Sequence, residues 1–365
     1  MSSTARILLG VVMTLSLLSG FLHEIWPDVS LSFKRLHIFG FNLLTGGSLI
    51  LYHTVGKGVF TPRLMAYFAF ALLYALFAAA GWYIPALALS IPLFLLVESV
   101  RIERFSVFPV DFFRRAPVSE KFEQASLLCL SIGIVFASLV ILNNEYLRLI
   151  HYQKLTIEVF FLGYSFPVSL ITMAIMFSFM TERTSRLLSV LKEISFWLVN
   201  LGVIVFFVFI IFELTIPVIV IAITLFVTVW MIFLLFLATA PNVQQKTFLV
   251  SGMIFLVFTA LTGILYVATY LYPSLDEYRG PLLVLHAMVS LYGWNLSGLF
   301  IIIRWDDFPI QLNSALAIAL HWGIVLVLAP IGKFVLAVAV LAVVAYAALL
   351  LIVLAGNANH EEAGR

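Results

Sequence analysis

Three histidines of this chain combine metal-binding chemistry with a regular placement along the sequence. His37, His151 and His286 each stand near the start of a long apolar segment, and these segments are the second, sixth and tenth of twelve. Imidazole in its neutral form binds haem iron and most transition metals. Cys129 is the only cysteine, so disulfides within the chain and cysteine-ligated clusters are excluded. A potential metal ligand therefore recurs at one point in each third of the chain.

The residues that share a helical face with two of these histidines are small. Residues three, four or seven positions apart in a helix lie on one face, which places Ser290 and Gly293 beside His286, and Gly40 beside His37. A flat macrocycle can approach such a face closely, and haem needs an axial imidazole with little bulk beside it. Small residues on membrane helices also mediate helix packing. The pattern predicts haem binding at His37 and His286, with helix packing as the alternative.

The composition of the chain is that of a membrane protein. Of its 365 residues, 63% are hydrophobic and only 10% are charged, whereas soluble domains are roughly 45–50% apolar and 25% charged. Runs of about 20 apolar residues predict spanning helices, because lipid offers backbone groups no partner outside a helix or a closed barrel. The runs lack the strict alternation of barrel strands. We therefore predict an all-α, polytopic membrane bundle of about 12 transmembrane helices.

Turn signals divide this bundle into similar units. The apolar segments lie near residues 5–22, 36–54, 63–81, 83–100, 122–142, 152–179, 194–212, 215–239, 246–272, 281–304, 312–330 and 333–355. Tight hairpins are expected between segments three and four, seven and eight, and eleven and twelve, with Pro85, Pro217 and Pro330 close to the turns. Each group of four segments thus contains one histidine at the start of its second segment and one hairpin between its third and fourth segments. The chain is thus expected to be a single integral membrane domain, residues 1–365, of three four-helix repeats, roughly 1–110, 111–240 and 241–365.

Basic residues are distributed unevenly between the two sides of this predicted topology. Fourteen Lys and Arg side chains fall on the side of the N-terminus and six on the other side. Because basic residues concentrate in cytoplasmic loops, we expect both termini in the cytoplasm, the protein in the plasma (inner) membrane, and the three histidines toward the outer face. The basic loop 101–121 follows the same bias, and it also suits the docking of a partner or of anionic headgroups.

Further titratable groups fall inside or at the edge of the segments. His151 lies at the mouth of segment six, where a metal ligand and a solvated interfacial residue are both consistent with the sequence. Glu158, two turns further along, and His321, near the middle of segment eleven, are candidates for a proton or ion path, because ionisable groups are costly in lipid. A structural ion pair for Glu158 with Lys154 and a structural hydrogen bond for His321 are the alternatives.

Two stretches carry a resemblance to a known superfamily. These are Leu36-His37-Ile38-Phe39-Gly40-Phe41-Asn42 and Leu285-His286-Ala287-Met288-Val289-Ser290-Leu291-Tyr292-Gly293-Trp294. Together with twelve segments and histidines opening segments two, six and ten, they resemble subunit I of the haem-copper oxidases and nitric oxide reductases, and the related NnrS membrane haem proteins. The resemblance implies that His37 and His286 are the axial pair of a low-spin haem, for which a b-type haem is expected.

Departures from the oxidase pattern bear on activity. The oxidases bind copper through one histidine on helix six and an adjacent pair on helix seven, and they carry a second histidine on helix ten. Segment seven here contains no histidine, and segment ten contains only His286. His151 would be a lone copper ligand, and copper needs several donors. We therefore expect a degenerate member without a complete copper site and without terminal oxidase or nitric oxide reductase activity. Its expected work is electron transfer, gas sensing, or the handling of nitric oxide or a metal.

Two other classes of function remain open at this stage. A cofactor-free, proton-coupled transporter or channel would use Glu158, His321 and His286 along its path. A structural subunit would bind other respiratory or membrane subunits. No phosphate-binding loop or nucleophile–base pair is recognisable in the sequence, and nucleic acid is not an expected partner.

Overall fold

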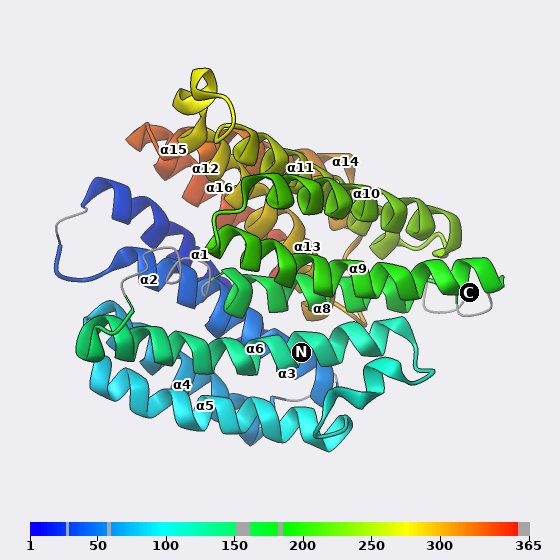
Figure 1. The fold of residues 1–365 in the computed structure, drawn as a ribbon, viewed down its shortest axis with the longest axis horizontal. Helices are drawn as coiled ribbons and strands as arrows, with labels where there is room; N and C mark the ends of the chain where they lie inside the picture. Colours follow the sequence, from blue (N-terminus) through cyan, green and yellow to red (C-terminus); the bar gives the residue numbers. More distant parts are fainter. Residues whose placement is uncertain (27–28, 57–59, 151–160, 182–184, 357–365) are drawn as a thin grey trace.

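The structure is a bundle of membrane-spanning helices. The computed structural model describes residues 1–26, 29–56, 60–150, 161–181 and 185–356. Every regular element in these ranges is a helix, and twelve helices are long and apolar enough to cross a membrane. The predicted all-α polytopic bundle is therefore confirmed, and the chain is a multi-pass membrane protein whose surface contacts lipid. The spans lie side by side, with α4 and α5 along one edge of the view in Figure 1.

The twelve spans follow the apolar segments closely. In chain order they are α1 (Ser3–Ile25), Phe33–Val55, α4 (Pro62–Ala79), α5 (Tyr83–Arg104), Val118–Leu147, Phe161–Phe179, α9 (Arg186–Ile211), α10 (Thr215–Thr239), α11 (Gln244–Ala268), Ser274–Ile303, Ala315–Gly332 and α16 (Leu336–Ala355). Local signals fix their ends. Thr61 caps α4 by accepting the backbone N–H of Leu64, and Pro62 occupies the first turn, where its missing N–H costs nothing.

The chain reverses at the three predicted hairpins. Between α4 and α5, Gly81 takes a φ of +75°, a left-handed conformation that glycine adopts without a steric penalty. Between α9 and α10, Glu213 adopts the same left-handed backbone conformation, with a φ of +57°. The third reversal follows α15 (Ala329–Gly332), whose first turn contains Pro330. The limits of the three predicted repeats stay a prediction.

Burial singles out three spans as the core of the bundle. The apolar windows of Phe33–Val55, Phe161–Phe179 and Ser274–Ile303 are 83%, 72% and 78% buried, whereas the other nine windows are between 28% and 50% buried. These are the second, sixth and tenth spans, so burial recurs at every fourth helix. Nine helices therefore shield three central ones from lipid, and two of those three carry His37 and His286 within the described ranges.

The second halves of the central spans pack directly on one another. They are α3 (Gly47–Val55), α8 (Phe166–Phe179) and α13 (Leu296–Ile303). Gly298 of α13 lies so close to Thr172 of α8 that no larger residue fits there without displacement. Just before this contact, Trp294 donates its indole N–H to Ser169 Oγ at 2.7 Å. Close backbone approach and polar side-chain bonds replace the hydrophobic effect as the force that joins helices in lipid.

Each central span also contains a π-helical stretch, in which the backbone bonds skip one additional residue. These stretches are η1 (Phe39–Gly46), η4 (Phe161–Ser165) and η6 (Val289–Asn295). π-Helical turns are rare and occur frequently at functional sites, because they redirect side chains and release carbonyl groups. His37 and His286 stand two and three residues before η1 and η6, so the widened backbone adjoins both imidazoles.

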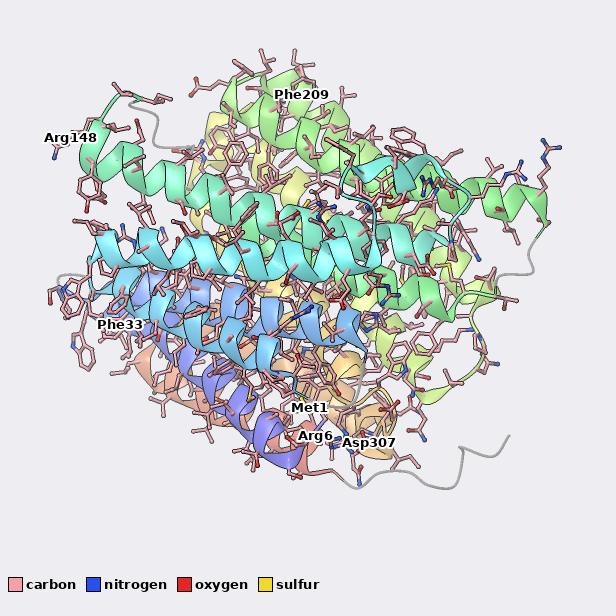
Figure 2. The ribbon with its side chains drawn as sticks, turned by 90° about the horizontal axis from the view of Figure 1, so that it is seen from below. Met1, Arg6, Phe33, Arg148, Phe209 and Asp307 are labelled. Atoms are coloured by element: carbon pink, nitrogen blue, oxygen red, sulfur yellow. The ribbon has the colours of Figure 1, made fainter. Side chains whose placement is uncertain are left out.

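A buried arginine, Arg304, holds three spans together by ion pairs and hydrogen bonds at the end of the bundle where the N-terminus lies. Arg304, whose side chain is 1% exposed, binds Asp307 Oδ1 at 2.9 Å and donates to the carbonyls of Val353 and Gly356. Arg6 of α1 binds the same carboxylate at 3.0 Å, and the two lie beside Met1 in Figure 2. Burial raises the pKa of Asp307, but the hydrogen bond and charge of Arg6, together with Arg304, outweigh it and lower that pKa. This network joins the first span, the tenth and the last.

Removing Arg304 is expected to destabilise the fold strongly. Arg304→Met leaves buried carbonyls without a donor and deprives Asp307 of a partner, a loss of about 3 kcal/mol by comparison with other broken buried pairs. Thermal unfolding of the purified protein in detergent, followed by tryptophan fluorescence, measures the change. Arg63→Gln is the matched control, because the pair of Arg63 with Glu103 is exposed and such pairs contribute about 0–1 kcal/mol. Equal losses in both variants would contradict the role given to Arg304.

Candidate functional site

His37 is held by the helix that precedes it in the chain. It belongs to α2 (Phe33–Ile38), and its Nδ1 lies 2.9 Å from the carbonyl oxygen of Ser16 on α1. A carbonyl oxygen can only accept, so Nδ1 carries the proton and donates it. The lone pair of the neutral ring is then on Nε2, at the other end of the imidazole. His37 is thus fixed in the tautomer in which Nε2 can bind a metal.

His286 is held in the same way on the other central span. It belongs to α12 (Arg279–Met288), and its Nδ1 lies 2.9 Å from the carbonyl oxygen of Thr259 on α11. A second oxygen, Thr262 Oγ1, lies 3.3 Å from the same nitrogen. Here too Nδ1 carries the proton and Nε2 keeps its lone pair. A bond of this kind from the far nitrogen to a carbonyl typically orients the histidine ligands of metal sites.

A glycine makes room for each imidazole. Gly20 follows Ser16 by one turn on α1, and a Cβ at this position would lie only 2.8 Å from Nδ1 of His37. Gly263 follows Thr259 by one turn on α11, and a Cβ there would lie 3.2 Å from Cε1 of His286. The same arrangement, a carbonyl and then a glycine one turn later against an imidazole, therefore occurs twice. In the sequence, the residue pairs Ser16/Gly20 and Thr259/Gly263 are the only trace of this arrangement. Their role is recognisable only from the contacts that they make with His37 and His286 in the structure.

Both imidazoles lie where the central spans are incompletely covered. Neither α2 nor α12 contains a fully buried residue. Every residue of η1, which follows α2 directly, is buried, and six of the seven residues of η6 are buried. The ends of these two spans that carry His37 and His286 therefore keep accessible surface, while the remaining parts of both spans are buried against other helices. His37 and His286 are themselves half-buried.

Tyr292 connects His37 to the span that carries His286. Its Oη lies 3.2 Å from Nδ1 of His37, and the two ring centroids are 5.9 Å apart. The phenol ring also packs against Phe41, with centroids 4.9 Å apart, and against Tyr346 in a perpendicular arrangement. Tyr292 belongs to η6, six residues after His286. The structure thus brings His37 of the second span into contact with the tenth span.

His321 is the most deeply buried histidine among the described residues, at 0% exposure. Its Nε2 donates to the backbone carbonyl of Tyr292 at 2.6 Å, and Phe248, Phe255 and Phe300 surround its ring. The π-helical backbone of η6 explains why this carbonyl can accept, because the N–H of Leu296 binds the carbonyls on either side of Tyr292. Nδ1 of His321 has no hydrogen-bond partner within the described ranges. His321 thus has the opposite tautomer to His37 and His286.

The small residues expected beside the histidines lie mostly in helix contacts. Gly40 packs against Ser16 of α1, and Gly293 packs against Phe255 of α11, both more closely than a larger residue would allow. Ser290 remains half-buried. The two glycines therefore hold the histidine-bearing spans tightly against the preceding helices, and this contact brings the carbonyls of Ser16 and Thr259 within reach of the imidazoles.

Two further candidates, His151 and Glu158, lie outside the described residues. Within the described ranges, no group of three or more His, Cys, Asp and Glu side chains is close enough to hold a metal ion. Fold and side chains together define a multi-pass helical membrane protein with histidines in its core.

Comparison with known proteins adds no relative to this description. No protein-family model matches the chain, and no curated protein matches it. Function is therefore inferred from the histidines, their hydrogen bonds and their surroundings.

The three tautomers can be checked directly. In protein free of cofactor, ¹⁵N spectra of labelled histidine are expected to show His37 and His286 with a proton on Nδ1, and His321 with a proton on Nε2, because each donates to a backbone carbonyl from that nitrogen. Spectra of the three single His→Ala variants assign the signals. A proton on Nε2 of His37 or His286 would contradict the assigned hydrogen bond.

Proposed function

We propose that the protein is an integral membrane haem-binding protein in which His37 and His286 are the axial ligands. The observation that supports this most directly is the duplicated hydrogen bond, from Nδ1 of each imidazole to a carbonyl of the preceding helix. It leaves Nε2 of both rings available, and it occurs on two of the three central spans. We further propose the relationship to subunit I of the haem-copper oxidases and to the NnrS proteins that the sequence resemblance implies.

The residues around the histidines fit a haem that is bound without a covalent link. Covalent attachment through two thioether bonds needs a pair of cysteines, and the chain has only Cys129. We therefore propose a haem held without thioether links, for which the b-type is the expected form. The spans around the histidines are rich in apolar side chains, such as the partly buried Leu285, and an apolar surrounding suits a porphyrin.

Two neutral imidazoles would complete the coordination of the iron. Bound haem supplies one-electron redox chemistry, and ligation by two protein side chains leaves no open position, which favours electron transfer over gas binding. The hydrogen bonds to Ser16 and Thr259 would raise the basicity of the ligands and hold the rings in position. If only one histidine binds, the open position would favour sensing of a gas or handling of nitric oxide.

A cofactor-free proton-coupled transporter or channel is the second candidate. The observation that favours it is the fully buried His321, whose Nδ1 has no hydrogen-bond partner in the described part of the chain and whose Nε2 binds Tyr292. A titratable side chain in this environment is typical of proton paths through membranes. Tyr292 lies between the two histidines, with its carbonyl bound to His321 and its hydroxyl beside His37.

We propose that the protein lies in the plasma (inner) membrane with both termini in the cytoplasm, as the bias of Lys and Arg toward one side favours. The histidines would then lie toward the outer face. An electron carrier in this position would exchange electrons with other respiratory or membrane subunits.

Absorption spectroscopy tests the haem ligands. The purified wild-type protein is expected to show a Soret band and a reduced-minus-oxidised difference spectrum of a six-coordinate haem, and both His37→Ala and His286→Ala are expected to lose that signature. His53→Ala is the control, because His53 lies on the same span as His37 but packs against Trp305. Metal analysis of the same samples measures iron and copper.

Each outcome of this experiment has a clear meaning. A normal spectrum in either alanine variant would remove that histidine from the axial pair. A wild-type protein that stays colourless after expression with added haem would contradict haem binding, and proton uptake into vesicles by wild type and His321→Gln would then test the transporter.

The glycines beside the imidazoles provide a second test. Gly20→Ala places a methyl group 2.8 Å from Nδ1 of His37 and must displace the ring, so haem affinity is expected to fall by about tenfold, the lower end of effects seen around metal ligands. Gly263→Ala, with a contact of 3.2 Å, is expected to have a smaller effect. Gly323→Ala is the control, because nothing lies within 4 Å of its new methyl group. Titration of the apoprotein with haem measures the affinities, and a normal affinity in Gly20→Ala would be inconsistent with the site.

A further inference from the structure

The connection between α5 and α6 (Val118–Leu142) is a structured loop, held from inside by a buried arginine. Arg101 is 3% exposed, pairs with Glu98, and donates to the carbonyls of Ser106 and Val107. Asp111 accepts the backbone N–H of Ser106 at 2.7 Å. Hydrogen bonds from Ser106 lower the pKa of the Asp111 carboxyl and keep it charged. The loop therefore has a defined conformation, in which a short helix, η2 (Pro109–Phe113), faces outward.

This loop exposes large apolar side chains next to arginines. Phe108 and Phe113 are 76% and 80% exposed, and Val107 is 58% exposed. In water this surface would be unfavourable, whereas at the boundary between acyl chains and headgroups aromatic side chains are stabilised. Arg114 and Arg115 follow Phe113 directly, so apolar and cationic groups adjoin, as they do in segments that lie in the membrane interface.

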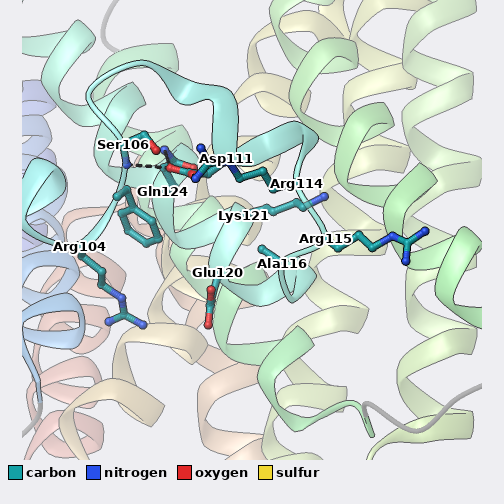
Figure 3. A pocket seen from close by; sticks show the side chains of 10 residues that line it. Arg104, Ser106, Asp111, Arg114, Arg115, Ala116, Glu120, Lys121 and Gln124 are labelled. Atoms are coloured by element: carbon teal, nitrogen blue, oxygen red, sulfur yellow. Dashed lines mark hydrogen bonds and ion pairs between the residues drawn. The ribbon is translucent and has the colours of Figure 1, made fainter.

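A hollow of about 370 Å³ opens beside the arginines. It is lined by Arg104, Phe105, Ser106, Asp111, Arg114, Arg115, Ala116, Glu120, Lys121 and Gln124. Figure 3 shows Arg114, Lys121 and Arg115 on one side of the hollow and Arg104 apart from them. Four of these ten side chains are cationic and two are acidic, so the hollow favours an anion.

The cations differ in how far their charge is already balanced. Lys121 is 4% exposed and binds both oxygens of Glu193 at 2.8 and 2.9 Å, which leaves a third N–H of its ammonium group for another acceptor. Arg104 pairs with Glu123, and Arg114 pairs with Asp111, each at 3.0 Å. Arg115 is exposed, and no hydrogen bond or ion pair to it occurs among the described residues. Arg115 is therefore the cation best placed to bind a ligand.

We propose that this hollow binds the phosphate group of an anionic phospholipid, with Arg115 as the main ligand and with Phe108 and Phe113 beside the acyl chains. Guanidinium groups bind phosphate oxygens in a two-point geometry, and cationic residues next to a span attract anionic lipids. The exposed phenylalanines select a lipid over a free phosphate ion, because only a lipid also covers apolar surface. The site lies on the side of the N-terminus, across the membrane from His37 and His286, and is independent of haem.

Lipid binding to the purified full-length protein tests this site. Native mass spectrometry in detergent, with phosphatidylglycerol and phosphatidylcholine added separately, is expected to show tighter binding of phosphatidylglycerol. Arg115→Gln is expected to weaken that binding by about fivefold, the effect of one cation near a membrane surface, without changing the binding of phosphatidylcholine. Because no hydrogen bond or ion pair joins Arg115 to another described residue, folding is expected to be unchanged, and thermal unfolding checks this. Phe108→Ser is expected to weaken both lipids, because it removes apolar contact alone.

Controls separate this site from other sources of binding. Arg186→Gln removes another exposed arginine, at the start of α9, and is expected to leave lipid binding unchanged. Equal binding of the two lipids by the wild-type protein would overturn the proposal. So would a loss of phosphatidylglycerol binding in Arg186→Gln as large as in Arg115→Gln, because that result indicates diffuse electrostatic attraction. Displacement of phosphatidylglycerol by millimolar inorganic phosphate would show a free-anion site and would also overturn it.

Discussion

A polar group inside a lipid bilayer must find its hydrogen-bond partner within the protein, and this constraint decides where the histidines of this chain lie. An imidazole N–H that is left unsatisfied away from water costs several kcal/mol. A helix carbonyl that already accepts one backbone bond has a second lone pair. The carbonyls of Ser16 and Thr259 supply it to His37 and His286. One hydrogen bond thus satisfies one ring nitrogen, orients the ring and leaves the other nitrogen free.

The same constraint explains the connection between His37 and His321. A π-helical turn interrupts the regular backbone bonding of a helix and leaves a carbonyl without its usual N–H partner. Tyr292 lies in such a turn. Its carbonyl accepts from His321 while its hydroxyl contacts His37, so two titratable rings on different spans depend on one residue. Any change in the backbone of η6 would therefore reach both histidines.

Much of this fold could be predicted from the sequence, because the length and apolar composition of each span identify it as a membrane-spanning helix. The reversals near Gly81 and Glu213 follow from breakers in long apolar runs. The central position of the second, sixth and tenth spans could have been predicted as well, since they are three of the four least apolar spans. Spans that contact protein instead of lipid can carry polar residues such as Asn42, Thr45 and Asn295.

The histidine contacts could not be predicted in the same way. Hydrogen bonds to backbone carbonyls carry no sequence signature, because every residue has a carbonyl. Only Gly20 and Gly263 mark these contacts in the sequence, and glycines on membrane helices are too common to be read alone. The sequence left ligand contact and helix packing both open for Gly40 and Gly293, and the structure places both glycines in close contacts between helices. The spacing of residues along a helix identifies those that share a face, but it does not show whether that face contacts another helix, a ligand or lipid.

The two ends of the bundle differ in a way that bears on function. Among the described residues, the buried cations are Arg101, Lys121, Lys192 and Arg304, and all four belong to the side of the N-terminus. Each binds carboxylates or carbonyls of neighbouring elements, so this side is closed by strong polar bonds. At the other end, Arg35, Arg279 and Lys333 are only partly buried, and α2 and α12 keep accessible surface. The side of the N-terminus is therefore the closed side of the bundle, and the proposed haem site lies on the accessible side.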